Sequence, residues 1–383
     1  MRYIKFLSRS LLIASTMSHV GCASSGHSDG ADADLLAQQW ATLRAEQPRL
    51  LARDAAQKLQ VSEAELLTTS IGTDAVRLRD GAATYEALYA RLHELGQIRV
   101  ITRNDAVVLE RVGTVVPVRR TEQGRHVLGT GLIGGVIDLR PAMGHWGYGF
   151  ALVQAGKEGK LMRSLQFFDH NGHAVNKVYL DNEVAGAAFD KLVADFKIQD
   201  QLASLKIGHP PVEDGSKPAT GVDLNKLRRT WNAMTDVHEF SSLLKTLNIT
   251  REQVLELIGT DAAYRIHAQS LPTLLYQLAQ QKQPVMVFVG NTGMMQIFSG
   301  TITRVERSGE WLNVLDPDFH LHLRMAAIDR GWVLKRPTSN GIITSVEFYD
   351  AKGEQVINFF SRRERQQQES DNWRKLVAGL TVS

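Results

Sequence analysis

The residues best suited to chemistry lie in the segment Thr235-Asp-Val-His-Glu239. Asp236 and Glu239 stand three positions apart, a spacing like that of a capping box, in which the two ends of a first helical turn bind each other. The pattern predicts His238 in the first turn of a helix, where the helix dipole disfavours a charged imidazole. A neutral imidazole can donate a lone pair to a metal ion. His238 is therefore a candidate metal ligand, and a merely solvated histidine at a helix start is the alternative.

A second candidate is Arg140, at the end of Val136-Ile-Asp-Leu-Arg140. The segment reads as a strand, and the two-residue period of a strand puts Asp138 and Arg140 on one face. Two interpretations stay open: an ion pair at the strand end, or a guanidinium that hydrogen-bonds a bound ligand. His320 and His322 also share one face of a predicted strand, but no third residue with metal-ligand spacing accompanies them.

The elements that position these residues come from an internal duplication. Ser70-Ile-Gly-Thr-Asp-Ala-Val recurs 187 residues later as Leu257-Ile-Gly-Thr-Asp-Ala-Ala. Several more matches follow in the same order at a nearly constant offset, which favours duplication over chance. They are Asn104 with Asn291, Gly113 with Gly300, Leu139-Arg140 with Leu323-Arg324, and Gln166-Phe-Phe-Asp with Glu347-Phe-Tyr-Asp.

The duplication predicts the organisation of the chain. Residues 1–33 are expected to be a disordered leader, and residues 34–199 the first repeat unit. Residues 200–222, rich in Gly, Pro and charge, read as a linker. Residues 223–383 form the second repeat unit.

Each unit shows the pattern of an α+β fold. Helical periodicity opens the units, over Leu35–Leu67 and over Leu227–Leu247. Short strands divided by turns follow, which predicts an antiparallel β-meander. In the second unit these include Val285–Val289, predicted to be buried throughout, and Thr301–Val305. A C-terminal helix closes each unit, over Glu183–Phe196 and Gln366–Leu380.

The two units differ where His238 stands. Aligning Trp40 with Trp231 places Ala45-Glu-Gln-Pro opposite the Asp236 segment, so the first unit has no matching histidine. This asymmetry predicts one site shared by the two units, not two equivalent sites.

Composition excludes several classes of protein. The 383 residues, 43% hydrophobic and 22% charged, fit a soluble globular protein of two or three domains. The 44 basic and 41 acidic residues give a net charge of +3, so we expect no nucleic-acid partner. A single cysteine, Cys22, excludes a disulfide framework and a cysteine metal cage. No apolar run is long enough to predict a membrane-spanning helix.

The leader bears on where the protein resides. Basic residues precede a short apolar run, Leu11–Ala14, as in a secretory signal. Cys22 stands where a lipoprotein cleavage site would need it, but His19 occupies a position that such sites give to an apolar residue. We therefore expect a cytoplasmic protein with a non-structural leader. An exported lipoprotein attached through Cys22 is the alternative.

Six segments, in order along residues 35–383, carry a resemblance to a known family. They are Trp231–His238, Val287–Gly300, Trp311–Arg324 and Arg336–Ser339 in the second unit, and Ile137–Arg140 and Leu165–Asp169 in the first. The chain resembles the tandem-repeat haemin-degrading and haem-trafficking proteins encoded with bacterial haem uptake systems, the haemin transport protein family.

The resemblance implies one haem, iron protoporphyrin IX, bound between the two halves. The histidine of the family's Thr-Asp-Val-His motif is the axial iron ligand, a role that falls to His238. The arginine of the Asp-Leu-Arg segment approaches the iron from the opposite face, which makes Arg140 the expected catalytic residue. One neutral histidine ligand leaves the sixth iron position open or weakly occupied.

The resemblance also implies basic residues that pair with the haem propionates. Arg251 and Arg336 stand at matching positions, and Arg363 is a further candidate. The family usually has Lys where Arg336 stands, and Arg permits bidentate contacts to a carboxylate. The family often has Tyr where Phe360 stands, so a hydroxyl contact is missing here.

Two functions follow from the resemblance. The first is oxidative haem degradation that releases iron after haem uptake, with dioxygen and a reductant or reductase. The alternative is a non-enzymatic haem chaperone or store that serves a separate haem oxygenase or the inner-membrane haem transporter. Both use His238.

Overall fold

The computed structural model describes residues 29–48, 50–117, 135–156, 159–181, 184–205, 207–208, 221–364 and 367–382. The first half begins with helices α1 (Asp29–Glu46), α2 (Ala52–Leu59) and α3 (Glu63–Thr68). Helix α1 starts inside the segment that the sequence assigns to the leader. Cys22 and most of the linker lie outside the described residues.

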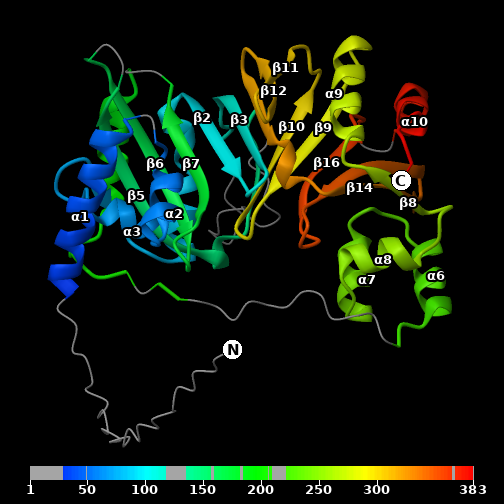
Figure 1. Cartoon of the computed structure of the whole chain (residues 1–383), viewed down its shortest axis with the longest axis horizontal. Coiled ribbons are helices and arrows are strands. Elements are labelled where there is room, and N and C mark those ends of the chain that lie inside the picture. Colours follow the sequence, from blue (N-terminus) through cyan, green and yellow to red (C-terminus); the bar gives the residue numbers. More distant parts are fainter. Residues whose placement is uncertain are drawn as a thin grey trace, which may run out of the picture.

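Two antiparallel sheets lie side by side (Figure 1). Within the described residues, the first sheet has nine strands in the order β1-β5-β6-β7-β2-β3-β13-β12-β11. These are β1 (Ala75–Arg77), β5 (Trp146–Ala155), β6 (Leu161–Asp169), β7 (Ala174–Leu180), β2 (Gln97–Arg103), β3 (Val107–Thr114), β13 (Phe319–Arg324), β12 (Trp311–Asp316) and β11 (Val305–Ser308).

The second sheet has seven described strands in the order β4-β10-β9-β16-β15-β14-β8. These are β4 (Asp138–Pro141), β10 (Met294–Gly300), β9 (Val285–Gly290), β16 (Gln355–Ser361), β15 (Gly341–Tyr349), β14 (Arg330–Thr338) and β8 (Ala263–His267). The α+β class and the two antiparallel meanders are as predicted.

The two halves exchange strands, which the sequence did not predict: among the described residues, the first half contributes β4 to the second sheet, and the second half contributes β13, β12 and β11 to the first. Strand β4 belongs to the first half but pairs with β10 of the second, with Arg140 opposite Met295. Strand β13 belongs to the second half but pairs with β3 of the first, with Leu323 opposite Val107. Strands β4 and β13 carry the matching pairs Leu139-Arg140 and Leu323-Arg324. The exchange of these two segments is therefore reciprocal, and it brings Arg140 to the sheet of the other half.

Helices cover the sheets in corresponding places. The first half adds α4 (Ala82–Tyr89), α5 (Gly186–Phe196) and the short 3-10 turns at Leu92–Leu95 and Met143–His145. The second half has α6 (Leu224–Asn232), α7 (Glu239–Leu247), α8 (Arg251–Leu257), α9 (Ser270–Gln280), a 3-10 turn at Met325–Ala327 and α10 (Asp371–Ala378). The closing helices were predicted, and α5 and α10 start three and five residues later than expected.

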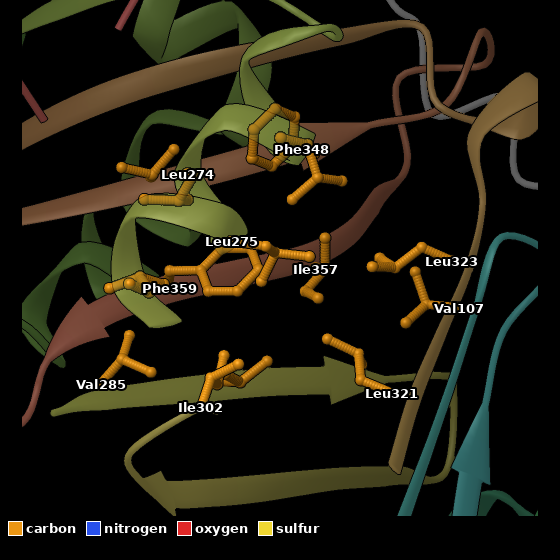
Figure 2. Close-up of a cluster of buried hydrophobic side chains, with 14 of the residues drawn as sticks. Val107, Leu274, Leu275, Val285, Ile302, Leu321, Leu323, Phe348, Ile357 and Phe359 are labelled. Carbon is orange, nitrogen blue, oxygen red and sulfur yellow. The ribbon is translucent and has the colours of Figure 1, made fainter. Parts of the chain in front are cut away.

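The hydrophobic core joins the two halves (Figure 2). Helix α9 packs Leu274 and Leu275 against Phe359 of β16. The same cluster continues to Leu321 of the exchanged strand β13 and to Val107 of β3. Because one core contains strands from both halves, neither sheet buries its apolar side chains alone.

A matched pair of asparagines ties the halves together. The Asn104 side chain accepts from the backbone of its own turn and donates to Gly290 O (3.0 Å) and Val356 O (2.8 Å) in the other half. The Asn291 side chain repeats the arrangement, donating to Arg103 O (2.9 Å) and Val175 O (2.8 Å). We call these two residues the asparagine pair. Their match in the sequence reflects a shared structural role.

Two predicted strands need correction. Residues Thr301–Arg304 are not a strand; β11 begins at Val305, because Asp316 accepts the backbone N–H groups of Thr303 and Arg304 and holds them in a turn. Strand β9 is not buried throughout. Val285, Val287 and Val289 are fully buried, whereas the residues between them are half-buried.

Candidate ligand-binding face of the second sheet

The half-buried residues of β9 belong to a distinct face of the second sheet. Residues paired directly across antiparallel strands share a face. The register aligns Met286 with Phe360, and Met295 with Arg140, and Phe288 alternates with core residues as Met286 does. We call Met286, Phe288, Met295, Phe360 and Arg140 the open face. All five are half-buried, so this side of β4, β10, β9 and β16 is apolar and partly accessible.

Helices α6, α7 and α8 cover the other end of the same side. Trp231 and Phe240 of these helices pack in one buried cluster with Trp332 and Leu334 of β14. Figure 1 shows the three helices gathered at that end of the molecule. The four strands β4, β10, β9 and β16 lie beside this helical layer. At about 4.8 Å between strands, the distance from β4 to β15 is roughly 19 Å.

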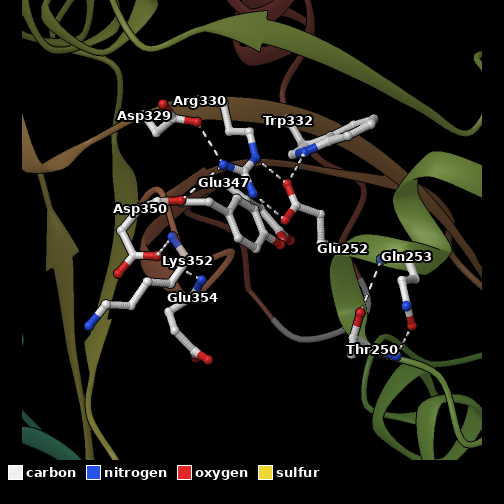
Figure 3. Close-up of polar contacts among 11 residues, drawn as sticks. Thr250, Glu252, Gln253, Asp329, Arg330, Trp332, Glu347, Asp350, Lys352 and Glu354 are labelled. Atoms are coloured by element: carbon white, nitrogen blue, oxygen red, sulfur yellow. Dashed lines mark hydrogen bonds and ion pairs between the residues drawn. The ribbon is translucent and has the colours of Figure 1, made fainter. Parts of the chain in front are cut away.

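The start of helix α8 is held against strand β14 by an ion pair. Thr250 and Gln253 form a capping box at the helix start, and Glu252 lies between Arg330 and Trp332 (Figure 3). Arg330 donates to both oxygens of Glu252 at 2.5 and 2.6 Å. These bonds fix the helix that carries Arg251.

His238 is the residue immediately before helix α7. Its side chain is 91% exposed and therefore lies off the core. The expected capping box is wrong: Glu239 accepts instead from the backbone and hydroxyl of Thr235, at 3.1 and 2.8 Å. Asp236 accepts from the backbone N–H of His238 at 2.8 Å and contacts its Nδ1 at 2.5 Å. The Nε2 atom is the ring nitrogen that points away from this carboxylate.

Arg140 lies on the open face, on the exchanged strand β4. It forms an ion pair with Asp138, the structural interpretation left open by the sequence. Burial raises the pKa of Asp138, against the lowering effect of the Arg140 charge. The Arg140 side chain is 30% exposed in this ion pair.

Arg251 and Arg336 meet beneath the helical layer. The Arg251 guanidinium forms a bidentate ion pair with Glu347, at 2.8 and 2.6 Å. Burial opposes ionisation of Glu347, but the Arg251 charge and hydrogen bonds lower the pKa of Glu347 to about 2. Ser345, Tyr349 and Gln355 also donate to this carboxylate. Arg251 is thus already paired within the protein.

Arg336 has a different environment. It is 4% exposed, and among the described residues its guanidinium donates one hydrogen bond, to the Ser345 hydroxyl at 3.3 Å. Its guanidinium lies over the rings of Phe240 and Phe360, at 5.9 and 5.0 Å. Burial and the like charge of Arg251 lower the pKa of Arg336 to about 10.

Two buried polar atoms on this side of the sheet have no hydrogen-bond partner among the described residues. They are Nε of Arg336 and Oδ1 of Asn358. Unpaired buried polar atoms are costly and call for an explanation such as a missing ligand. Among the described residues, Arg336 forms no direct ion pair, and Glu347, the carboxylate that acts on its charge, is already paired with Arg251. A buried cation of this kind, next to an apolar open face, fits a flat apolar ligand that carries an acidic group. The residues present therefore fit haem.

Arg363 follows β16 and lies at the edge of this region. Its positive charge contributes to the lowered pKa of Asp236, after the larger effect of the hydrogen bond from the His238 backbone. The guanidinium also donates to Gln367 O at 3.4 Å. Arg363 is thus near the Asp236–His238 pair and apart from the buried Arg251–Glu347 pair.

Sequence reasoning missed Glu347 and the apolar residues of the open face. An acidic residue inside the apolar strand Val346-Glu-Phe-Tyr349 was a usable signal for Glu347. The sequence held no comparable signal for Met286 and Phe288. Both faces of β9 are apolar, so the alternation of residues along the strand does not show which face is buried.

The corresponding face of the first sheet carries a cluster of ion pairs. The Glu63 carboxylate, at the start of α3, forms ion pairs with both Lys177 and Arg103. Burial raises the pKa of Glu63, but the two cations more than offset it and the pKa is lowered. The two halves therefore differ in the residues on this face of their sheets, and the prediction of a single site stays a prediction.

Comparisons with known proteins identify the class. The family model of the haemin-degrading HemS/ChuX domain matches the chain twice, over residues 60–196 and 248–380. The chain therefore belongs to the haemin-degrading HemS/ChuX family, as a tandem repeat of two such domains. In the part of the chain that the structure describes, no helix is long and apolar enough to cross a membrane.

Particular relatives cover nearly the whole chain. The hemin transport protein HmuS of Yersinia pestis is 37% identical over 348 residues, covering 90% of this chain and 97% of the relative. Holo-PhuS, a heme-binding protein from Pseudomonas aeruginosa, superposes with a TM-score of 0.85 at 38% identity, covering 92% and 99% of the two chains. The heme-degrading enzyme ChuS of Escherichia coli O157:H7 gives 0.81 at 33% identity, covering 91% and 99%.

Proposed function

We propose that the protein binds one haem over the open face and degrades it oxidatively, releasing iron after haem uptake. The observation that carries the proposal is the buried Arg336 beside an apolar face, which forms no direct ion pair within the part of the chain that the structure describes. It is supported by relatives of both kinds, a heme-binding protein and a heme-degrading enzyme. Haem would supply the redox-active iron, and dioxygen and a reductant or reductase are the co-reactants.

The residues have distinct roles in this proposal. His238 would hold the haem iron through Nε2. Arg336 binds one propionate as an ion pair, and the charge of Arg251, held by Glu347, adds to the local positive potential. Arg363 is near enough to the Asp236–His238 pair to contact a propionate at the outer edge. Arg140, on the open face, would donate a hydrogen bond to a ligand bound there.

The second candidate function is a haem chaperone or store that passes intact haem to a haem oxygenase or to the inner-membrane transporter. The 91% exposure of the His238 side chain favours it, because an accessible ligand can exchange haem with a partner. It requires the same residues, so only the fate of the haem separates the two functions.

One experiment tests both. Haemin is added to the purified protein, the Soret band is recorded, and a reductant is added in air with catalase present to remove free peroxide. Loss of the Soret band with release of iron supports degradation. A stable haem spectrum that is lost only on transfer to a haem oxygenase supports the chaperone.

The first prediction concerns the axial ligand. His238→Ala should lose the haem-induced Soret shift, because the iron loses its protein ligand. His267→Ala, which removes an exposed histidine from the far edge strand β8, should titrate as the wild type does. An unchanged spectrum and affinity in His238→Ala would exclude His238 as the ligand.

A further inference from the structure

The loop that carries His238 is held at both ends. The Thr235 carbonyl accepts from the backbone N–H of Ser339, in the turn between β14 and β15, at 2.9 Å. The Thr235 backbone N–H and hydroxyl donate to Glu239 at 3.1 and 2.8 Å, which closes the loop against the first turn of α7. The loop is therefore fixed both to the sheet and to the helix.

Within this loop, one carboxylate oxygen serves two donors. Oδ1 of Asp236 accepts from the backbone N–H of His238 at 2.8 Å and lies 2.5 Å from Nδ1 of the same residue. The backbone bond is an Asx turn, in which an aspartate binds the N–H group two residues on. Because the backbone places the oxygen, the contact to the ring is preset by the fold.

This contact decides which ring nitrogen carries the proton. A carboxylate accepts hydrogen bonds, so the nitrogen facing it must be the N–H of a neutral imidazole. Nδ1 then holds the proton, and Nε2 keeps a free lone pair. A hydrogen bond from the second nitrogen to a carboxylate also fixes the ring orientation and makes the ligand more basic.

We infer that Asp236 is a positioning residue that sets the tautomer, the orientation and the donor strength of His238 for the iron. The inference rests on the proposed function, since it assumes that His238 binds haem iron. The first half supports the coupling of the two residues. Its aligned segment has Ala45 and Gln47 at the two positions, so it lacks both the carboxylate and the imidazole.

Two substitutions separate the two effects of Asp236. Asp236→Ala removes the acceptor and the charge, whereas Asp236→Asn removes the charge but keeps an oxygen that can accept from Nδ1. Asp371→Ala is the matched control, since Asp371 is an exposed aspartate on α10, which packs on the opposite side of the sheet.

The first measurement needs no haem. Nitrogen-15 NMR of the apoprotein reports which ring nitrogen of His238 carries the proton. The wild type, Asp236→Asn and Asp371→Ala should show the Nδ1–H tautomer, and Asp236→Ala should shift toward Nε2–H. The same tautomer in Asp236→Ala and in the wild type would overturn the inference.

The second measurement uses the haem complex. Asp236→Ala should bind haem roughly 10- to 100-fold more weakly, the usual effect of removing the partner of a ligating histidine. Asp236→Asn should retain most of the affinity but show a lower iron–histidine stretching frequency, because the ligand donates less. Wild-type affinity and stretching frequency in both variants would overturn the inference while leaving haem binding intact. Absence of haem binding in the wild type would instead defeat the proposed function and this inference with it.

Discussion

At the scale of single residues, the buried side chains of Arg251 and Arg336 have opposite effects on the stability of the unliganded protein. Arg251 is neutralised by Glu347, whereas Arg336 is buried with no ion-pair partner in the part of the chain that is described. A buried unpaired charge costs free energy in the unliganded protein and strengthens any interaction that pairs it. In the proposed function, Arg336 would therefore lower the stability of the free protein and strengthen the binding of a ligand carboxylate.

Arg336→Met provides the test. The apoprotein should keep or gain stability in urea denaturation, because an apolar side chain of similar volume replaces an unpaired charge. Its haem affinity should fall by roughly tenfold or more, since a charged hydrogen bond is worth about 1.5–3 kcal/mol. Haem dimethyl ester, which lacks the carboxylates, should bind the variant and the wild type equally. A loss that persists with the ester would mean that Arg336 acts through packing.

Glu347 sets a dependence of stability on pH. Its pKa is lowered from 4.5 to about 2, so its contribution to the free energy of unfolding is fully present above the unfolded value and is lost as pH falls toward about 2. Glu347→Gln should destabilise the protein by about 3–5 kcal/mol at pH 7, because it breaks a buried ion pair. In urea denaturation, the difference from the wild type should shrink as the pH is lowered below about 4.5.

The control for this prediction is Glu354→Gln, which changes an exposed glutamate of the same half. It should leave the free energy of unfolding within about 0.5 kcal/mol of the wild type. A difference between Glu347→Gln and the wild type that stays constant down to pH 3 would show that the lost stability comes from packing and not from ionisation.

At the scale of the elements, the strand exchange determines in which sheet Arg140 and Arg324 lie, and so which of these two matching arginines is on the open face. Strand β4 carries Arg140 from the first half into the second sheet, and β13 carries Arg324 into the first. The two arginines match in the duplication, yet Arg140 lies on the open face, while Arg324 donates to Asp105 O at 2.9 Å. Arg324 is therefore the natural control for Arg140.

Arg140→Ala should retain haem binding but change the iron spin state or slow haem degradation, because it removes a hydrogen-bond donor without removing the ligand. Arg324→Ala should leave both unchanged. The checks are the Soret and visible bands of the complex and the rate of Soret loss with reductant. Equal behaviour of the two variants would assign Arg140 to the Asp138 ion pair alone.

Local patterns predicted the type of most elements but not their partners. Helical periodicity and the final helices were found because amphipathic spacing is a local property, visible in Leu227 and Trp231. The exchange of β4 and β13 was not predicted, because strand pairing between matching segments depends on tertiary contacts. The predicted capping box between Asp236 and Glu239 was wrong for a similar reason. Each carboxylate accepts a hydrogen bond from a nearby backbone N–H group, and the spacing of the two residues does not determine which group each one binds.

At the scale of the whole molecule, the asparagine pair joins the halves by equivalent bonds. Asn104→Ala leaves Gly290 O and Val356 O without their side-chain donor, and Asn291→Ala does the same for Arg103 O and Val175 O. Each substitution should cost about 1–3 kcal/mol in urea denaturation, the cost of unpaired buried groups. Similar losses for the two variants would confirm the equivalence. A loss in one alone would show that the halves depend on it unequally.

The strand exchange also affects how the occupancy of such a site depends on protein concentration. Two copies of one unit that trade a strand about a twofold axis form a swapped homodimer, in which each site borrows an arginine from the other copy. Such a site is complete only when the copies meet, so its occupancy falls with dilution. Joining the copies in one chain turns that encounter into an intramolecular event. The fused protein keeps the borrowed arginine at any concentration. If one haem is bound, as proposed, the matching face of the first sheet need not bind a ligand, and there Glu63 forms its ion pairs with Lys177 and Arg103.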